Sequence, residues 1–464
     1  MLRNPSKTDL ILLGSLFLCE LSLTVIAMMI YRKGERPFGV FVFSKPGVAF
    51  FVAIALSLIV GTVVILKYIA STRSQSRHFQ LIVMMNFVTV VVVLLIGEGT
   101  LRLSSRSSKE GETLFGTVLT PKNWDKLTLH YWRRLEKASD SRSCEVYDDL
   151  MGWTNGPNRQ CSHGMYWISS EGIRAPHAGH SFADVPAKPR IALVGNSYTF
   201  ALDVSYEDSW GYLLERALQS RFQVLNFGVG GYGIHQAYLR YEKDVRGWKP
   251  DIVIFGFISH DLNRTMTVYP FLSFFGWGPF SSPRFVLRNG ELTLLNVPPV
   301  SPETILSHRT ISALPFIEYD SGYKESEWEK GPYQFSYLLR LFVSWFPRWS
   351  AVSPDVSDEA FVAVNAAILR SFVSSATQAG SIPIVVYFPH GEVKDGARAR
   401  SSEPIHEQVL RAAQIHYTDL TPCLLELNAT DRFVSDSDGG HYSPQGNARV
   451  ASCLRNIVDE VLTR

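Results

Sequence analysis

Three long apolar segments within the first hundred or so residues most constrain how this chain can fold. They cover residues 10–30, 48–66 and 81–101, and each is close to the roughly 20 residues that a helix needs to cross about 30 Å of hydrocarbon. The first segment is longer than the apolar core of a secretory signal, which has about 7–15 residues, and two further segments follow it. The sequence therefore predicts a membrane anchor of three transmembrane helices over residues 1–103.

Two features bear on which side of the membrane the large domain lies. An odd number of spans separates it from the amino terminus, and five Lys and Arg residues flank the spans on the amino-terminal side against seven on the other. This difference weakly favours a cytoplasmic domain under the positive-inside rule. Four cysteines outside the spans suit two disulfides in an oxidising compartment, with free buried thiols as the alternative: Cys144, Cys161, Cys423 and Cys453. We expect an extracytoplasmic domain, periplasmic or at the cell surface.

Beyond the anchor the pattern changes twice. Residues 104–185 are polar and repeatedly interrupted by glycine and proline, which indicates a lead-in segment that wraps the following domain. In residues 186–464, short apolar runs alternate with stretches of helical periodicity. Such runs predict a parallel sheet with helices on both faces, a three-layer α/β domain. The predicted strands cover residues 190–196, 222–228, 251–257 and 382–388.

An aromatic-rich insertion interrupts this alternation over about residues 265–355. It contains two apolar runs around Asn289 and Gly290, which predict a hairpin, and an apolar stretch at 333–346, which predicts a helix. The insertion could form a lid or an acceptor-binding wall beside the sheet, or a satellite core.

In the last apolar segment before the lead-in, Glu98 lies one turn from Arg102, so we expect the two to pair.

Ser197 is the first candidate for chemistry. It follows a predicted buried strand and precedes a helical stretch, and ligands of open parallel sheets bind at the carboxyl ends of the strands. Far downstream, Asp438 precedes His441 by three residues, and Ser443 and Pro444 then form an N-cap and first-turn pair for a helix. A serine nucleophile needs a base and an orienting group, which these residues can supply. Taken separately, Ser197 could be a helix N-cap, and Asp438 and His441 could form a loop hydrogen bond.

The chain resembles the SGNH (GDSL-type) esterase/acyl hydrolase superfamily in four short blocks, and the lead-in is similar to segments that precede this domain in membrane-anchored relatives. The blocks, in order, are "GNS" at 195–197, "NFGVGGYG" at 226–233, "FGFISHDLNR" at 255–264 and "DGGH" at 438–441. Two residues depart from the family pattern. Asn196 stands where the family has Asp, and His260 stands where it has the Asn that donates to the oxyanion. The resemblance implies a flavodoxin-like α/β/α domain.

The resemblance also implies site roles. Ser197 would be the nucleophile, His441 the general base and Asp438 the acid that orients it. The oxyanion hole would consist of the backbone N–H groups of Ser197 and Gly231 with the side chain of His260, unless His260 has a structural role beside Asp261. Candidate substrate contacts are Asn263, Arg264 and His390. This chemistry requires no metal and no cofactor.

Three functions are compatible with this sequence. The first is a membrane-anchored serine esterase or O-acyl hydrolase, acting on acylated or acetylated surface glycan or lipid. The second is an O-acyltransferase to a cell-envelope glycan through the same acyl-enzyme. The third is a catalytically silent binding or scaffold module, suggested by the His260 replacement. The expected partners are an ester- or acyl-bearing substrate and the lipid bilayer. With a net charge of +2 and no run of basic residues, a nucleic-acid role has no support.

Overall fold

The computed structural model groups the chain into two compact units. Unit 1 comprises Met1–Leu127 and Glu325–Val352, and unit 2 comprises Thr128–Lys324 and Ser353–Arg464. The first two predicted spans and Asp438 lie outside the described residues. The structure describes residues 88, 91–92, 94–138, 144–161, 164–183, 188–273, 278–345, 358–390, 404–434 and 440–463.

Unit 2 is built on a five-stranded parallel sheet with the strand order β10-β9-β11-β14-β15. Numbered along the chain this order is 2-1-3-4-5, the order of flavodoxin-like folds. The parallel α/β sheet predicted from the sequence is thus confirmed, with β15 as a strand that the apolar pattern did not indicate. The strands are β9 (Arg190–Gly195), β10 (Gln223–Asn226), β11 (Ile252–Phe257), β14 (Ile382–Tyr387) and β15 (Tyr417–Asp419).

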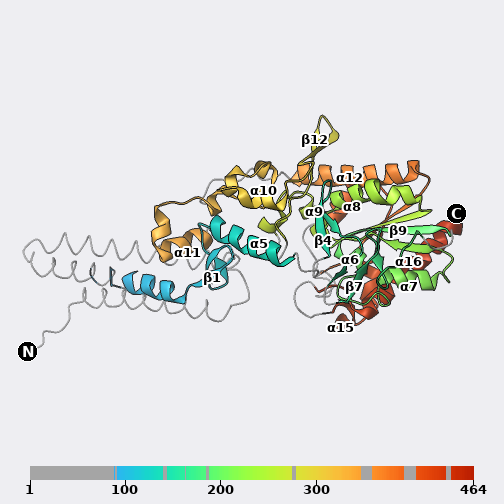
Figure 1. Cartoon of the computed structure of the whole chain (residues 1–464), viewed down its shortest axis with the longest axis horizontal. Helices are drawn as coiled ribbons and strands as arrows, with labels where there is room; N and C mark the ends of the chain where they lie inside the picture. The colour runs from blue at the N-terminus through green and yellow to red at the C-terminus, as the bar shows by residue number, and fades with distance from the viewer. Residues whose placement is uncertain are drawn as a thin grey trace, which may run out of the picture. The chain divides into compact units, whose positions relative to one another are not determined.

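Helices cover both faces of this sheet, which gives the three predicted layers (Figure 1). Successive strand residues point to opposite faces, so Ala192 and Val194 enter one core while Ile191 and Leu193 enter the other. The first core is closed by α8 (Ile234–Arg240), α12 (Asp358–Gln378) and α13 (Ile405–Ala413), and the second by α7 (Trp210–Ala217) and α16 (Pro444–Thr463).

Among the described residues, one helix is long and apolar enough to cross a membrane. It is α12, over Glu359–Gln378. Its residues Ile368, Leu369 and Phe372 are fully buried in the first core. Packing against the sheet therefore accounts for the apolar character of α12, and the prediction of an anchor rests on the amino-terminal segments.

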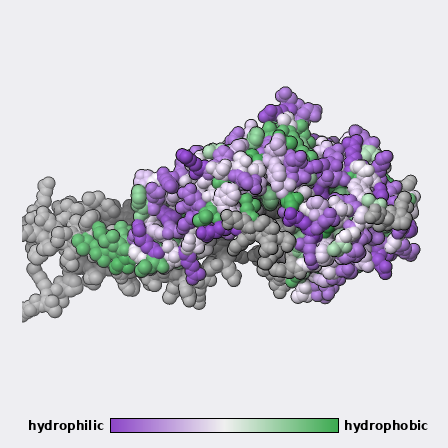
Figure 2. All heavy atoms as spheres, viewed as in Figure 1, coloured by the Kyte–Doolittle hydropathy of each residue, from purple (hydrophilic) through white to green (hydrophobic). Residues whose placement is uncertain are grey.

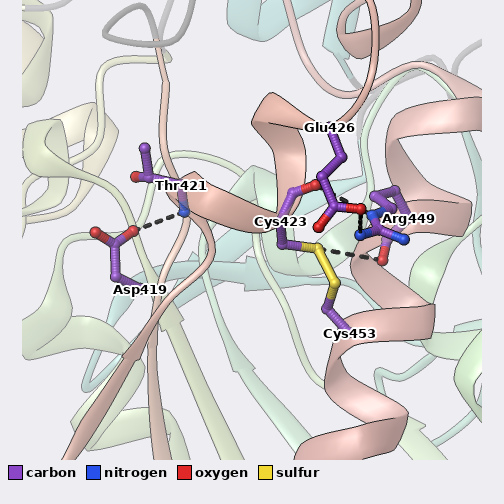
Figure 3. The surroundings of a disulfide bond; sticks show 6 residues. All are labelled: Asp419, Thr421, Cys423, Glu426, Arg449 and Cys453. Atoms are coloured by element: carbon purple, nitrogen blue, oxygen red, sulfur yellow. Dashed lines mark hydrogen bonds and ion pairs between the residues drawn. A yellow bond between two sulfur atoms is a disulfide. The ribbon is translucent and has the colours of Figure 1, made fainter. Parts of the chain in front are cut away.

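The lead-in is divided between the two units, and from Glu145 onward it forms short antiparallel strands within unit 2. The four cysteines outside the predicted spans form two disulfides, which excludes the alternative of free thiols. The strands are β4 (Glu145–Asp148), β5 (Gly152–Asn155), β6 (Gln160–Cys161), β7 (Tyr166–Ile168) and β8 (Arg174–Ala175). Cys144 bonds to Cys161 within the lead-in. Cys423, in α14 (Thr421–Leu425), bonds to Cys453 of α16 beside the Glu426–Arg449 ion pair (Figure 3).

The predicted insertion is divided between the two units. Its first part lies in unit 2 and contains the predicted hairpin of β12 (Arg284–Arg288) and β13 (Glu291–Leu295), with α10 (Pro302–Ser307) after it. Asn289 and Gly290 have φ values of 53° and 85°, as a two-residue type I′ turn requires. Its second part, from Glu325, belongs to unit 1 and contains the predicted helix as α11 (Tyr337–Trp345).

In unit 1, residues 94–104 are helical, so the described part of the third predicted span has the expected structure. Leu94, Leu95 and Ile96 are exposed, and Figure 2 shows a hydrophobic surface over this helix. Glu98 pairs with Arg102 at 2.8 Å as predicted. Unit 1 also holds the strands β1 (Arg106–Ser108), β2 (Gly111–Leu114) and β3 (Thr117–Val118), and the chain then enters α5 (Trp124–Ala138).

The carboxylate of Glu98 also holds the start of α11. It accepts hydrogen bonds from the backbone N–H groups of Tyr337 at 2.8 Å and Leu338 at 3.1 Å. These N–H groups have no acceptor within their own helix, so Glu98 supplies the cap from a helix more than 200 residues earlier in the chain.

Candidate active site

A tight turn at the carboxyl end of β9 presents Ser197. A side chain at Gly195, whose φ is 153°, would collide with the backbone oxygen of Gly256 on the neighbouring strand. Asn196 then caps the short helix α6 (Ser197–Phe200), because its Oδ1 accepts from the backbone N–H of Tyr198 at 2.8 Å. Ser197 is thus fixed where the parallel-sheet rule predicted a ligand-binding edge.

His441 reaches Ser197 from the far end of the domain. Its Nε2 lies 2.9 Å from the Oγ of Ser197. Immediately after it, Ser443 caps α16 by accepting from the N–H of Gly446 at 3.0 Å, as the sequence predicted. The ring of Tyr198 packs against the imidazole at a centroid distance of 5.1 Å. The predicted serine and histidine are therefore within hydrogen-bonding distance of each other.

The other imidazole nitrogen faces a residue that the sequence did not predict for the site. His441 Nδ1 lies 2.7 Å from Oδ2 of Asp203. A carboxylate can only accept, so this contact puts the imidazole proton on Nδ1 and leaves Nε2 to accept from the Ser197 hydroxyl. The hydrogen bond to His441 lowers the pKa of Asp203. Asp438, the acid predicted from the sequence, lies outside the described residues and its role stays a prediction.

The lead-in holds the loop that carries Asp203. The backbone N–H of Asp203 donates to the Tyr166 hydroxyl at 2.7 Å. Arg174, which is 1% exposed, donates to the carbonyl oxygens of Ala201 at 2.5 Å and Val204 at 2.7 Å. Burial lowers the pKa of Arg174 to about 10, so its guanidinium remains charged at neutral pH.

The lead-in also braces the loop that contains Gly231, one of the predicted oxyanion donors. Gly231 is buried, with a φ of 72°, between β10 and α8. Trp153 donates to the carbonyl oxygen of Gly230 at 3.0 Å, and Asn155 donates to that of Gly228 at 3.0 Å. This loop runs beside the turn at Ser197, because the N–H of Val229 donates to the carbonyl oxygen of Gly195 at 3.1 Å.

His260 and His390 lie together near Tyr198. His260 is exposed and is the second residue of α9 (Ser259–Arg264). Its ring centroid is 5.0 Å from that of His390, which is 5.8 Å from that of Tyr198. Since Tyr198 also contacts His441, these aromatic rings connect His441 to both His390 and His260 at the carboxyl edge of the sheet.

Asp261 connects α9 to the turn that carries Asn196 and Ser197. It is 1% exposed and accepts from Asn196 Nδ2 at 2.5 Å, from the N–H of Ile258 at 3.0 Å and from Arg264 Nη1 at 2.6 Å. Burial raises the pKa of Asp261 to about 7, against the lowering effect of Arg264 and the N–H donors. Of the predicted substrate contacts on α9, Arg264 is thus paired with Asp261, and Asn263 is exposed.

Within the described ranges, no three His, Cys, Asp or Glu side chains gather in a way that could hold a metal ion. Around Ser197, the described groups form a chain of hydrogen bonds from the Ser197 hydroxyl through the His441 imidazole to the Asp203 carboxylate. Such a chain can transfer a proton away from the hydroxyl as its oxygen attacks an electrophile.

No family model and no curated protein matches the chain. Solved structures similar to it include a lipase/acylhydrolase from Enterococcus faecalis, with 14% identity and a TM-score of 0.31 over 59% of this chain and 96% of that one. A catalytic mutant of an acetylxylan esterase from Geobacillus stearothermophilus has 13% identity and a TM-score of 0.31 over 59% and 94%. An acetyl xylan esterase has 14% identity and a TM-score of 0.32 over 58% and 99%. The functional argument rests on the geometry of the site.

Proposed function

We propose that this chain is a membrane-anchored serine esterase or O-acyl hydrolase of the SGNH type, with Ser197 as nucleophile and His441 as general base. The observation that carries the proposal is the 2.9 Å contact between Ser197 Oγ and His441 Nε2. It lies at the carboxyl end of β9, where a substrate can approach, and joins residues 244 positions apart in the chain. The alternative role of Ser197 as a helix N-cap does not apply, because Asn196 is the N-cap of α6.

The first half-reaction forms an acyl-enzyme. Ser197 Oγ attacks the ester carbonyl carbon while His441 Nε2 takes the hydroxyl proton. The carbonyl oxygen becomes an oxyanion, which the backbone N–H groups of Ser197 and Gly231 and the His260 side chain stabilise in this proposal. When the intermediate collapses, the carbon–oxygen bond to the alcohol breaks, and His441 returns the proton to the leaving oxygen. The acyl group remains on Ser197.

The second half-reaction releases the acid. A water molecule attacks the acyl carbon, His441 takes one of its protons, and the bond to Ser197 Oγ breaks as the proton returns to the serine. An acceptor hydroxyl in place of water would give acyl transfer through the same steps. An acylated or acetylated surface glycan or lipid is the substrate class that suits an enzyme fixed at a membrane.

The location of the domain is part of the proposal. The two disulfides in unit 2 support an oxidising, extracytoplasmic compartment. The exposed apolar residues of the helix over 94–104 support its continuation into the bilayer. A membrane-impermeant reagent or protease that never reaches residues 104–464 from outside intact cells would overturn this location, with a known surface protein as the labelled control.

A fluorophosphonate probe tests the catalytic proposal on the full chain in membranes. We expect covalent labelling of the wild type at Ser197, none in Ser197→Ala and a reaction about 100-fold slower or more in His441→Ala, the loss typical of a missing general base. A wild type that stays unlabelled, beside a serine esterase labelled in parallel, would favour the scaffold function. Hydrolysis of an aryl acetate, compared across the same variants, then shows whether the acyl-enzyme turns over.

A further inference from the structure

The catalytic proposal requires a group that holds His441 in one tautomer and one orientation. His441 Nε2 can accept the serine proton only if the imidazole proton stays on Nδ1. In the part of the chain that the structure describes, the carboxylate at hydrogen-bonding distance from Nδ1 is that of Asp203, with its Oδ2 at 2.7 Å.

The backbone after the nucleophile explains how Asp203 reaches the imidazole. Helix α6 ends at Phe200, its C-cap residue Ala201 has a φ of 59°, and Asp203 has a φ of 69°. Two left-handed residues so close together turn the chain back towards the nucleophile. Non-glycine residues seldom adopt this conformation, and Asp is among those that tolerate it best. Such strain persists where the surrounding structure fixes it, and it concentrates at functional sites.

Three contacts from the lead-in fix this loop. Tyr166 accepts from the N–H of Asp203, and Arg174 donates to the carbonyl oxygens of Ala201 and Val204 on either side. Tyr166 is 3% exposed and Arg174 is 1% exposed, so both supports are buried although the Asp203 side chain itself is 46% exposed. The Cys144–Cys161 disulfide packs in the same cluster with Tyr166 and Phe200.

We propose that Asp203 is the positioning residue of the catalytic histidine, and that the lead-in segment holds it there through Tyr166 and Arg174. This inference rests on the proposed function and names a different acid from Asp438, which the family resemblance implies. The carboxylate accepts from Nδ1 throughout the cycle and stabilises the imidazolium that forms when His441 takes the serine proton. No proton passes to Asp203.

The exposure of Asp203 sets the size of the expected effect. Replacement of a buried triad aspartate by Asn lowers kcat by about 10⁴-fold. Water can partly replace a carboxylate that is 46% exposed, so we expect Asp203→Asn to slow fluorophosphonate labelling and ester hydrolysis by about 10–100-fold. The loss should fall on kcat, with KM little changed, because Asp203 acts through the imidazole.

The experiment compares four variants of the full chain in detergent or membranes: Asp203→Asn, Asp203→Glu, Asp438→Asn and Asp208→Asn. Asp208 is an exposed carboxylate on the same loop and serves as the matched control. We expect the loss of kcat in Asp203→Asn, partial rescue in Asp203→Glu, a smaller loss in Asp438→Asn than in Asp203→Asn, and the wild-type rate in Asp208→Asn. Equal thermal unfolding temperatures establish that the variants fold.

A readout without substrate separates this inference from the proposed function. A proton held between Nδ1 and a carboxylate gives a low-field proton resonance, which should vanish in Asp203→Asn and in His441→Ala but persist in Asp438→Asn. The assignment to Asp203 would be overturned if Asp203→Asn kept the wild-type rate and the resonance while Asp438→Asn lost both. That result would leave the esterase proposal intact. An unlabelled wild type would reject the esterase, whereas the resonance would still test the Asp203–His441 contact.

Discussion

Asn196 and Asp261 form a buried hydrogen bond between adjacent strand ends, with Asn196 Nδ2 donating to Asp261 Oδ2 across 2.5 Å. Asn196 uses its other side-chain atom, Oδ1, to cap α6. An aspartate at position 196, as in the pattern that this turn resembles, could accept for the helix but could not donate to Asp261 while ionised. The amide of Asn196 therefore both caps α6 and donates to the buried carboxyl group of Asp261.

We expect Asn196→Asp to destabilise the protein by at least about 1–3 kcal/mol at pH 8, and by less at pH 5. In the folded variant, the new carboxyl group and that of Asp261 would share one proton. The pKa of this pair in the folded state would therefore lie above the unfolded value of about 3.9. Stability is then retained at low pH and lost as the pH rises through the folded pKa. Thermal unfolding at both pH values measures the difference. Asn263→Asp, on the exposed side of α9, controls for the added charge, and an equal, pH-independent loss in both variants would contradict the argument.

Arg174→Lys should lower kcat about tenfold while KM changes little. Lysine keeps the charge but lacks the planar fork that spans the carbonyl oxygens of Ala201 and Val204. Steady-state kinetics with an aryl ester measures both constants. Arg240→Lys is the matched control, because Arg240 is equally buried but contacts Thr154, Gly172 and Asp244 instead. If Arg240→Lys reduced kcat as much, general loosening rather than the Asp203 loop would explain the loss.

The two disulfides should differ in their effect on activity. Removing either one costs about 3 kcal/mol or more in the chain-entropy model, since they close loops with separations of 17 and 30 residues. Cys144→Ser/Cys161→Ser should also reduce kcat, because this pair packs against Phe200 at the end of α6. Cys423→Ser/Cys453→Ser should retain kcat at temperatures where both variants are folded. Activity normalised to the folded fraction tests this, and equal specific activities would count against the prediction.

His260→Ala should slow acylation by about 10²–10³-fold, the loss typical of one missing oxyanion donor. Because His260 is exposed, the substitution should leave the unfolding temperature unchanged. His260→Asn, which installs the side-chain amide of the SGNH pattern, should restore much of the rate. Single-turnover labelling measures the acylation step, and His390→Ala shows how much of the loss arises from the ring contact between the two histidines. A wild-type rate in His260→Ala would assign the oxyanion to backbone donors alone.

Ser197 and His441 were predictable because simple rules locate them. Ser197 follows a buried strand in a βα turn, and His441 precedes a helix whose Ser–Pro start is visible in the sequence. Asp203 had no such signal. Its position depends on two left-handed backbone angles and on supports from Tyr166 and Arg174, and no local pattern encodes these.

The layers of unit 2 could be predicted from the sequence, but the division of the insertion between the two units could not. Apolar runs and helical periodicity report burial along one element, so they indicated the sheet, the hairpin and α11. They do not report which distant element covers an apolar face. The membership of Glu325–Val352 in unit 1 depends on tertiary contacts such as that of Glu98 with Tyr337.

The 244-residue separation between Ser197 and His441 also bears on when the chain becomes reactive during its synthesis. The serine and its proposed aspartate emerge from the ribosome together, but without the imidazole the hydroxyl has no base and remains an ordinary alcohol. The nascent chain therefore cannot use His441 as a base until synthesis has advanced 244 residues beyond the serine. Hydrolytic activity would begin only with the final packing of α16 against α7.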